Sequence, residues 1–488
     1  MKKNIILFIV SILIFSACSD ENYADLNINP DRPSDAPSES LFVAATKSLV
    51  DQMTTISVNL NHFRFFAQYV AQRNFAAESN YELVERTVPQ SHWSEIYRDV
   101  LLDLDDAKTR IPNEGLLGNV PSNRIAITEM LSVYAWQQLV DTFGDIPYTE
   151  ALLRSESFNP AYEDAQMIYM DLFERINQAL SLVDKDASGF GSSDKIYNDD
   201  ISKWKKFGNS LKLRLAIRVL EVPAFTTIAQ TAISEAVAAG VLTSNEDNAI
   251  LKYETSQPNT NPNFVILNPA ISGRPFDFFP ANTIVDYMNN LEDPRRPLYF
   301  NNNLKDSSGN VIYKGGTYGT TNILENTTHL NPNLVTNPEF RGVLLSYSEV
   351  SFMLAQATEL GVDVGSDAET FYNNGITASM QDWGVAADDI TSYLDRSDVD
   401  YNTADGTWQE KLGLQYWLAM YNRGFEGWTL WRQLNAPALN VAVDSKKPVP
   451  VRYTYPVEEQ TLNGTNYTAA ATAIGGDTQQ NKLFWDVN

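Results

Sequence analysis

Cysteine and histidine are both scarce in this chain of 488 residues, which contains one cysteine, Cys18, and three histidines, His62, His92 and His329. A single cysteine excludes a disulfide within the chain and any cysteine-rich zinc or iron–sulfur site. The histidines lie far apart and form no His-Glu-x-x-His motif, and no Gly-x-Ser-x-Gly motif or glycine-rich phosphate loop is present. The sequence therefore predicts no metal site, no cofactor and no catalytic residue.

Basic residues are also few, with 36 Lys and Arg against 61 Asp and Glu, which gives a formal net charge of −25. The chain has no basic stretch, and this argues against nucleic-acid binding because phosphate contacts need Lys and Arg. A hydrophobic share of 43% with 11% aromatic residues argues against a disordered chain. The length is compatible with one large domain or with two to four smaller ones.

The chain has no apolar run of the ~18 residues that a membrane-spanning helix needs. Its longest apolar stretch, Ile5 to Phe15, follows Lys2 and Lys3 and precedes Ser16, Ala17 and Cys18. This layout is typical of a secretory signal peptide. We predict a signal peptide over residues 1–17 and an N-terminal linker and start segment over residues 18–40.

Most of the remaining sequence, residues 41–488, has helical periodicity and is predicted to form one mainly α domain. Ser91 and the pair Ser366/Glu369 have the character of helix N-caps. The stretch Leu211 to Val219 alternates as a strand would and also fits a helix. Further helices are predicted around Ile127–Leu139 (ending near Gly144), Ile168–Val183, Tyr347–Ala357 and Leu412–Asn422. Helices in pairs with short connections favour stacked hairpins of the tetratricopeptide type.

Two regions depart from this pattern. Residues 254–342 are rich in Asn, Pro, Gly, Ser and Thr, and the tail from Pro448 onward is also irregular. Such composition predicts loops. A loop-rich insertion of this length in a compact protein is usually functional.

Two motifs stand out in the helical part of the chain. They are Asp141-Thr-Phe-Gly-Asp-Ile-Pro-Tyr-Thr-Glu-Ala151 and the helix that contains Lys-Leu-Arg-Leu-Ala-Ile-Arg218. Both resemble motifs of the SusD/RagB family of nutrient-binding lipoproteins. Other matching stretches, in family order and spacing, are Asn29-Pro30, Gln68–Gln72, Trp93–Tyr97, Asp293-Pro-Arg295, Glu349–Gly361, Tyr455-Pro456 with Glu459 and Asn463, and Trp485-Asp486.

The N-terminus carries its own resemblance. Small residues before Cys18 resemble the lipobox of bacterial lipoproteins, which implies cleavage before Cys18 and acylation of its thiol. The acidic pair Asp20 and Glu21 resembles a surface-export signal of Bacteroidetes lipoproteins. Together they imply a lipid-anchored protein in the outer membrane that faces the cell exterior. A plain signal peptide with an incidental cysteine is the alternative.

The family resemblance implies a tetratricopeptide-like helix-pair scaffold with a large irregular, loop-rich, ligand-facing region, and it implies a helix for Lys212 to Arg218. It also implies a binding protein, not an enzyme, that captures an oligosaccharide and delivers it to a TonB-dependent outer-membrane transporter (SusC-like). A peptide-binding member is one alternative. A surface glycosidase is another because 61 acidic residues always offer carboxylate pairs. A third is a structural partner that mainly binds another protein.

A sugar site needs flat aromatic faces, together with amide and guanidinium donors, on loops held by a rigid scaffold. Two segments meet this requirement. Candidates in the first are Arg73, Asn74, Phe75, Asn80 and Tyr81, and those in the second are Asn263, Phe264, Arg274, Phe276, Phe278 and Tyr318. The large tryptophans, by contrast, are predicted to lie in the core: Trp93, Trp136, Trp204, Trp383 and Trp485.

Overall fold

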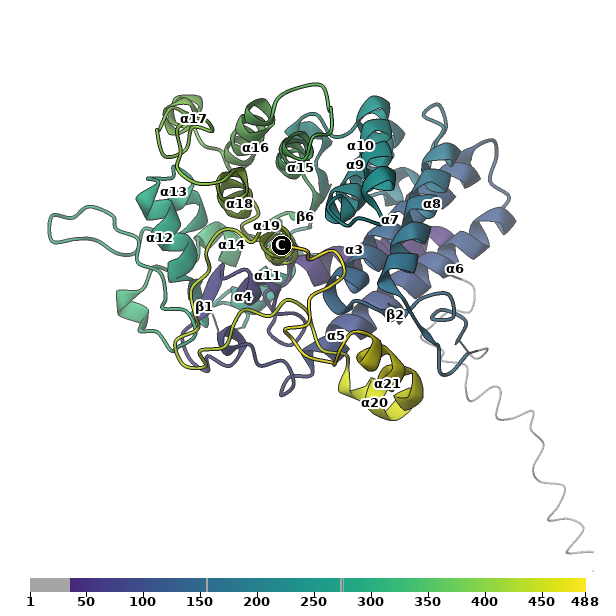
Figure 1. The fold of residues 1–488 in the computed structure, drawn as a ribbon, viewed down its shortest axis with the longest axis horizontal. Helices are drawn as coiled ribbons and strands as arrows, with labels where there is room; N and C mark the ends of the chain where they lie inside the picture. The colour runs from purple at the N-terminus through teal and green to yellow at the C-terminus, as the bar shows by residue number, and fades with distance from the viewer. Residues whose placement is uncertain (1–35, 155–156, 273, 275) are drawn as a thin grey trace, which may run out of the picture.

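Helices dominate the structure and follow one another in contacting pairs (Figure 1). The computed structural model describes residues 36–154, 157–272, 274 and 276–488, so the predicted signal peptide and Cys18 lie outside the described residues. In Figure 1 the pairs cross the upper half of the molecule from right to left, and the last pair lies below them. The pairs are α7 (Val120–Phe143) with α8 (Ala165–Leu182), α9 (Ile201–Val219) with α10 (Thr226–Ala239), α15 (Tyr347–Glu359) with α16 (Ala368–Trp383), and α18 (Trp408–Ala419) with α19 (Gly424–Leu434).

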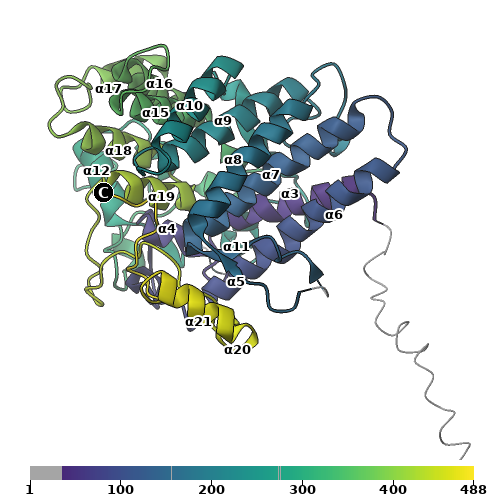
Figure 2. The ribbon, with the colours of Figure 1, turned by 45° about the vertical axis from the view of Figure 1, so that its right-hand side comes forward.

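Helices from the N-terminal part of the chain form a second layer that packs against these pairs. The first described helix, α3 (Ser38–Thr54), lies along α6 (Leu102–Arg110), as Figure 2 shows. A π-helical segment, Glu95–Leu101, joins α5 (Val88–Ser94) to α6. The remaining short helices are α4 (Phe63–Phe66), α17 (Ala387–Leu394), α20 (Val457–Leu462) and α21 (Gly464–Ala473). The mainly α prediction with paired helices is therefore confirmed.

Most predicted helices are present, and the ambiguous stretch Leu211–Val219 is helical within α9. Helix α7 ends where predicted, at Gly144, whose φ of 88° is accessible to glycine at little cost. Two predicted caps were wrong. Helix α5 begins at Val88, before Ser91, because Pro89 suits the first helical turn. Helix α16 is capped by Asp367 in place of Ser366, because the Asp367 carboxylate accepts the backbone N–H of Thr370 at 2.7 Å.

The segment over residues 254–342 is more ordered than its composition indicates. It contains α11 (Pro262–Leu267), α12 (Asn282–Asn290), α13 (Arg296–Tyr299) and α14 (Pro332–Thr336). Asn261 and Asn331 cap α11 and α14, and a proline follows each cap as the first helical residue. Between these short helices the segment is irregular, so the prediction of a loop-rich region is confirmed. The C-terminal tail likewise contains two short helices, α20 and α21.

The described residues form three short antiparallel strand pairs: β1 (Val70–Gln72) with β5 (Phe278–Pro280), β2 (Ile146–Pro147) with β3 (Tyr162–Glu163), and β4 (Ala249–Leu251) with β6 (Gly342–Leu345). The first and third pairs connect distant parts of the chain. The β4–β6 pair brings together the two ends of the loop-rich segment. The whole segment therefore leaves the helical scaffold and returns to it at one place.

Buried charges fasten β6 to the scaffold. The Leu344 carbonyl accepts hydrogen bonds from Arg214 at 3.0 Å, Arg423 at 2.9 Å and Tyr134 at 3.2 Å. Glu349 pairs with both guanidiniums, and each N–O distance is 2.6 Å. These groups come from α7, α9, α15 and α19, so one cluster joins four scaffold helices to the base of the loop-rich segment.

The tryptophans mostly lie in the core as predicted. Trp93, Trp136, Trp204 and Trp485 are buried, whereas Trp383 is half-buried at the edge of a cavity. Asp141 in the signature motif is also buried. It accepts hydrogen bonds from the Tyr169 hydroxyl at 2.6 Å and Arg218 Nε at 3.1 Å, and burial raises the pKa of its carboxyl. The motif is thus a helix end that is fixed into the scaffold.

Candidate functional site

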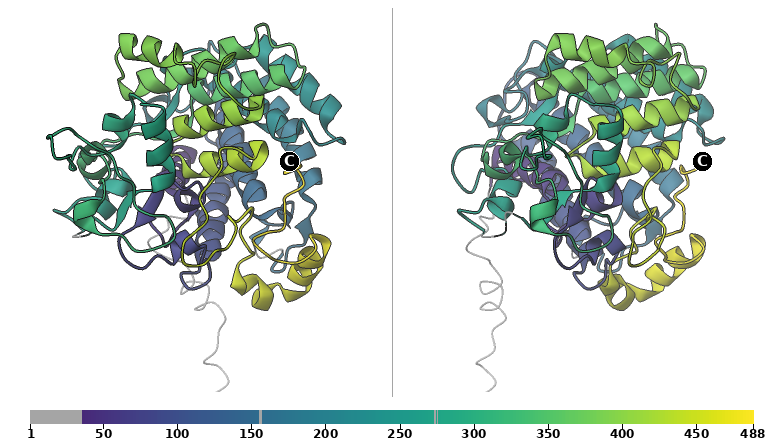
Figure 3. Two further views of the ribbon diagram at one scale, coloured as in Figure 1. Left: turned by 60° about the vertical axis from the view of Figure 1, so that its left-hand side comes forward. Right: turned by 90° about the vertical axis from the view of Figure 1, so that its left-hand side faces the viewer.

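The two predicted ligand-binding segments meet where β1 pairs with β5. In both views of Figure 3 the purple N-terminal part of the chain lies beside the teal-green loop-rich segment. Gln72 lies opposite Phe278, and the Arg73 backbone N–H donates to the Asp277 carbonyl at 2.9 Å. The loop that begins at Arg73 and the loop that ends at Asp277 therefore emerge from the same end of one two-stranded ladder. Residues about 200 positions apart in sequence become neighbours by this pairing alone.

A third segment lies against β1. The Asn322 backbone N–H donates to the Arg73 carbonyl at 3.0 Å, and its side-chain amide donates to the Gln72 carbonyl at 2.9 Å. Ile323 follows directly, and its side chain is 63% exposed. This segment lies within the loop-rich region 254–342 that the sequence predicts to be functional, but residue type did not select Ile323, and its contact with β1 is long-range and has no periodic signature.

Surface side chains of these three segments form what we call the loop face. Asn74, Phe75, Arg274, Phe276 and Ile323 are exposed, and Arg73 is half-buried. Phe75 is the most exposed of its aromatic residues, at 81%. Phe276 is 37% exposed, and its ring lies 4.9 Å from the ring of His329. A flat apolar surface with guanidinium and amide groups beside it has the chemistry to bind a sugar ring and its hydroxyls.

Phe75 has an unusual backbone conformation. Its φ of 56° lies in the left-handed region, which non-glycine residues rarely adopt. Such strain costs on the order of 1 kcal/mol or more and is concentrated at functional positions. Here the strained residue holds a large apolar ring in solvent, where the ring contributes little to folding.

The remaining sequence candidates do not reach this surface. Phe264 is half-buried on α11. Asn80 is also half-buried, and its amide donates to the Gly319 carbonyl at 3.0 Å and accepts the Ser445 backbone N–H at 2.8 Å. Asn80 therefore holds neighbouring loops in position.

Four candidates are buried in the interior: Tyr81, Asn263, Phe278 and Tyr318. The Tyr318 hydroxyl donates to the Phe65 carbonyl at 2.6 Å, and the Asn263 carbonyl oxygen accepts the Ile56 backbone N–H at 2.7 Å. Their polar groups are occupied within the protein, so we place these four in the support of the loop face and not on its surface. Composition does not distinguish a loop aromatic that packs inward from one that points outward.

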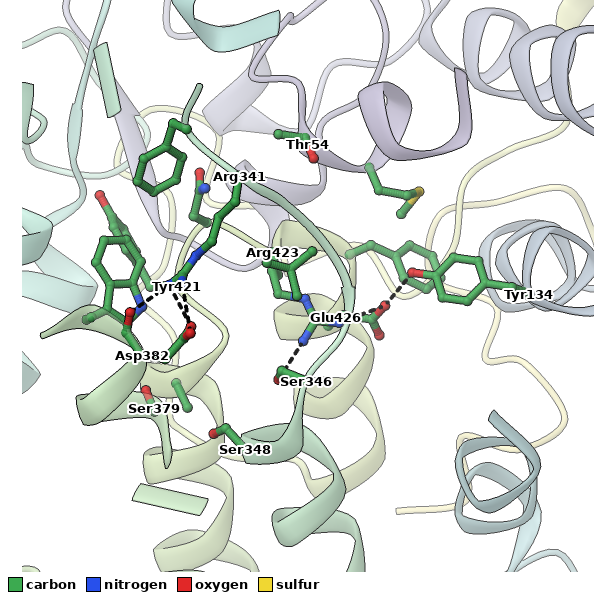
Figure 4. A pocket seen from close by; sticks show the side chains of 17 residues that line it. Thr54, Tyr134, Arg341, Ser346, Ser348, Ser379, Asp382, Tyr421, Arg423 and Glu426 are labelled. Atoms are coloured by element: carbon green, nitrogen blue, oxygen red, sulfur yellow. Dashed lines mark hydrogen bonds and ion pairs between the residues drawn. The ribbon is translucent and has the colours of Figure 1, made fainter. Parts of the chain in front are cut away.

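A separate cavity lies between β6 and the scaffold helices (Figure 4). The Arg341 guanidinium makes two hydrogen bonds to Asp382, of 2.7 and 2.6 Å, on one side of the cavity. On the other side Tyr134 donates to Glu426 at 3.3 Å. Burial raises the pKa of both carboxyls, Asp382 and Glu426.

Carboxyls with raised pKa values near one another are the groups a glycosidase would use. This cavity has a volume of about 50 Å³, however, whereas ~150 Å³ is needed to hold a benzene ring. It therefore does not admit a sugar ring, and each carboxyl already has an arginine partner. We assign the cavity to the charged junction between β6 and the scaffold. Within the described ranges, no group of three or more His, Cys, Asp or Glu side chains is arranged to hold a metal ion.

Comparison with known proteins identifies the family. A family model described as "Starch-binding associating with outer membrane", the SusD-like model, matches residues 30–456. The chain belongs to the SusD-like family. Comparison with curated protein sequences found no significant match.

Solved structures of SusD-like proteins agree with the fold. A chitin-binding protein is 25% identical, with a TM-score of 0.80 over 92% of this chain and 100% of that chain. A SusD homologue from Bacteroides thetaiotaomicron is 21% identical, with a TM-score of 0.77 over 93% and 100% of the two chains. A chitin-binding SusD homologue from Flavobacterium johnsoniae is 22% identical, with a TM-score of 0.77 over 92% and 99%. No helix among the described residues has the length and apolarity to cross a membrane.

Proposed function

We propose that this SusD-like protein is a lipid-anchored, glycan-binding protein of the outer-membrane surface that passes an oligosaccharide to a TonB-dependent (SusC-like) transporter. The anchor in this proposal is Cys18. The observation that carries the glycan-binding part is the backbone pairing that brings together the segments bearing the exposed Phe75, Phe276 and Ile323. Family membership supports the location at the outer membrane and the transporter as partner.

A chito-oligosaccharide is the first ligand to test, because a chitin-binding protein shares 25% of its residues with this chain and superposes over nearly its whole length. The chemistry of the loop face fits this choice. Apolar side chains such as Phe75 and Ile323 suit the methyl of an N-acetyl group, and the adjacent Asn74 amide suits its carbonyl. The protein binds its ligand and does not cleave it.

The test is calorimetric titration of the purified protein with chitohexaose, maltohexaose and a casein-derived peptide mixture. We expect chitohexaose to bind with Kd on the order of 1 μM, about −8 kcal/mol, without release of reducing ends. Phe75→Ala should weaken binding about tenfold, equivalent to ~1.4 kcal/mol. Phe158→Ala is the matched control, since Phe158 is also 81% exposed but lies on a loop next to α21.

Sustained release of reducing ends by the pure protein would overturn the assignment as a binding protein. Binding of the peptide mixture, without binding of either glycan, would mean that the ligand is a peptide. Equal losses of affinity in Phe75→Ala and Phe158→Ala would show that the loop face is not the binding site.

A further inference from the structure

The imidazole of His329 contacts both the loop face and the protein interior. Its ring centroid lies 4.9 Å from that of the exposed Phe276, with 49° between the ring planes. The same ring lies 5.8 Å from the ring of Phe279 on β5, with 25° between the planes, and Phe279 is completely buried. The side chain of His329 is half-buried, whereas those of His62 and His92 are fully buried. His329 is therefore the histidine of this chain that borders the proposed ligand site.

A hydrogen bond fixes the orientation of the His329 imidazole. Its Nε2 lies 3.3 Å from the Leu324 carbonyl oxygen. Because a carbonyl oxygen only accepts hydrogen bonds, Nε2 carries the proton. Leu324 follows Ile323 directly, and the Ile323 carbonyl accepts the Thr327 hydroxyl at 2.8 Å. The imidazole thus joins the segment that carries Ile323 to the ring of Phe276.

The backbone of His329 is held as well. Its N–H donates to the Asn303 side-chain oxygen at 2.9 Å, and its carbonyl accepts the Asn301 backbone N–H at 2.9 Å. The next residue, Leu330, pairs with the fully buried Phe300, which directly follows α13. His329 is therefore a fixed point against which a loop side chain can pack.

Phe276 needs such a point. Its side chain is 37% exposed, and among the described residues the ring of His329 is the one aromatic ring in contact with it. The neighbouring Asp277 carbonyl is held by the Arg73 N–H at 2.9 Å, which fixes the backbone beside Phe276 and leaves its ring free to turn. Immobilising a free side chain on binding costs affinity, so a ring that is already held favours binding.

We propose that His329 is a positioning residue of the loop face, which holds the Phe276 ring in the orientation that receives the ligand. This inference rests on the proposed function and deepens it, because it names the residue that preorganises the site. His329 acts through Phe276. Removal of the imidazole should therefore weaken binding only while the Phe276 ring is present.

The test is calorimetric titration of the full-length protein with chitohexaose, in a double-mutant cycle of His329→Ala and Phe276→Ala. We expect His329→Ala to weaken binding about three- to tenfold, the range of one aromatic pair. In the Phe276→Ala background the same change should alter Kd by less than about twofold. His329→Phe keeps an aromatic ring beside Phe276 and should bind within about twofold of the wild type.

Tyr401→Ala is the matched control, because Tyr401 is also half-buried and its ring also lies 4.9 Å from a neighbouring ring, that of Tyr372. It lies on the loop between α17 and α18, and its loss should leave chitohexaose binding unchanged. An equal loss in Tyr401→Ala would mean that His329→Ala acts through general destabilisation, and would overturn the proposal.

Three other results would also overturn it: His329→Ala binds as the wild type does, His329→Phe binds as weakly as His329→Ala, or the effects of His329→Ala and Phe276→Ala on Kd multiply in the double variant. Failure of the proposed function looks different. In that case the wild type does not bind chitohexaose, or Phe75→Ala and Phe276→Ala both bind as the wild type does, and this inference falls with it. Weakened binding in those two variants, with unchanged binding in His329→Ala, would overturn the role of His329 alone.

Discussion

Replacement of Glu349 by Gln is the sharpest test of the junction between β6 and the helical scaffold. Glu349 is almost fully buried and pairs with both Arg214 and Arg423 at 2.6 Å. Glutamine keeps the shape of the side chain and removes its charge. Two buried guanidiniums then share only Glu426, whose distances to them are longer, at 3.6 and 3.7 Å.

The expected cost follows from burial. A buried ion pair that loses one partner leaves an uncompensated charge, which destabilises a protein by about 3–5 kcal/mol. We therefore expect Glu349→Gln to lower the free energy of unfolding by that amount. The matched control is Glu292→Gln, because Glu292 pairs with Arg396 at 3.2 Å and neither side chain is buried, with Glu292 73% and Arg396 28% exposed. Exposed pairs contribute about 1 kcal/mol or less.

The assay is urea denaturation at pH 7 followed by circular dichroism, with both variants compared with the wild type. The two losses should differ by at least ~2 kcal/mol. Although burial favours the neutral form, Arg214 and Arg423 hold the pKa of Glu349 below its ordinary value of 4.5. The stabilisation by Glu349 should thus be complete above pH 4.5 and decline as the pH falls through the lower pKa of the folded state. Equal losses in Glu349→Gln and Glu292→Gln would refute a role of the buried cluster in stability.

Three further predictions follow from the structure and the sequence. Gly427→Ala should destabilise the protein by about 1–3 kcal/mol, because a Cβ on α19 would overlap the Tyr69 hydroxyl. That hydroxyl is fixed by its 2.6 Å hydrogen bond to the Trp417 carbonyl. Thermal unfolding measures the loss, and an unchanged melting temperature would contradict this packing. Burial lowers the pKa of His62 to about 4 and that of His92 to about 3. The free energy of unfolding should therefore decline as the pH falls from 6.5, the pKa of an unfolded histidine, towards these values. His92→Phe should make this dependence on pH less steep, and an unchanged dependence would contradict the burial of a neutral His92. Cys18→Ser should move the protein from the membrane fraction to the soluble fraction on cell fractionation, because the proposed anchor needs the thiol; a variant still in the membrane fraction would contradict lipid anchoring.

The helical scaffold was largely predictable because its helices carry an apolar face at regular spacing. Helix α9 shows the limit of periodicity, since Leu211 to Val219 fits a strand equally well and only the family resemblance favoured a helix. The cap at Asp367 was missed by one position because Ser366 and Asp367 are both good capping residues. These errors are local and left the arrangement of helix pairs unaffected.

The site was predictable only in part. Residue type and loop composition selected Asn74, Phe75 and Phe276, and these residues are exposed on the loop face. The same reasoning selected Tyr81 and Tyr318, which are buried. Ile323 lies in the loop-rich region predicted to be functional, but residue type did not select it, because it joins the face through the contact of Asn322 with β1. Long-range pairing, and not composition, decides which loop residues are exposed.

A crystal structure of the protein with chitohexaose tests the central claim most directly. The account predicts a sugar ring on the face of Phe75, within the ~4 Å of direct apolar contact, and a second contact at Phe276 or Ile323. An oligosaccharide bound elsewhere, with Phe75 still fully exposed to solvent, would contradict it.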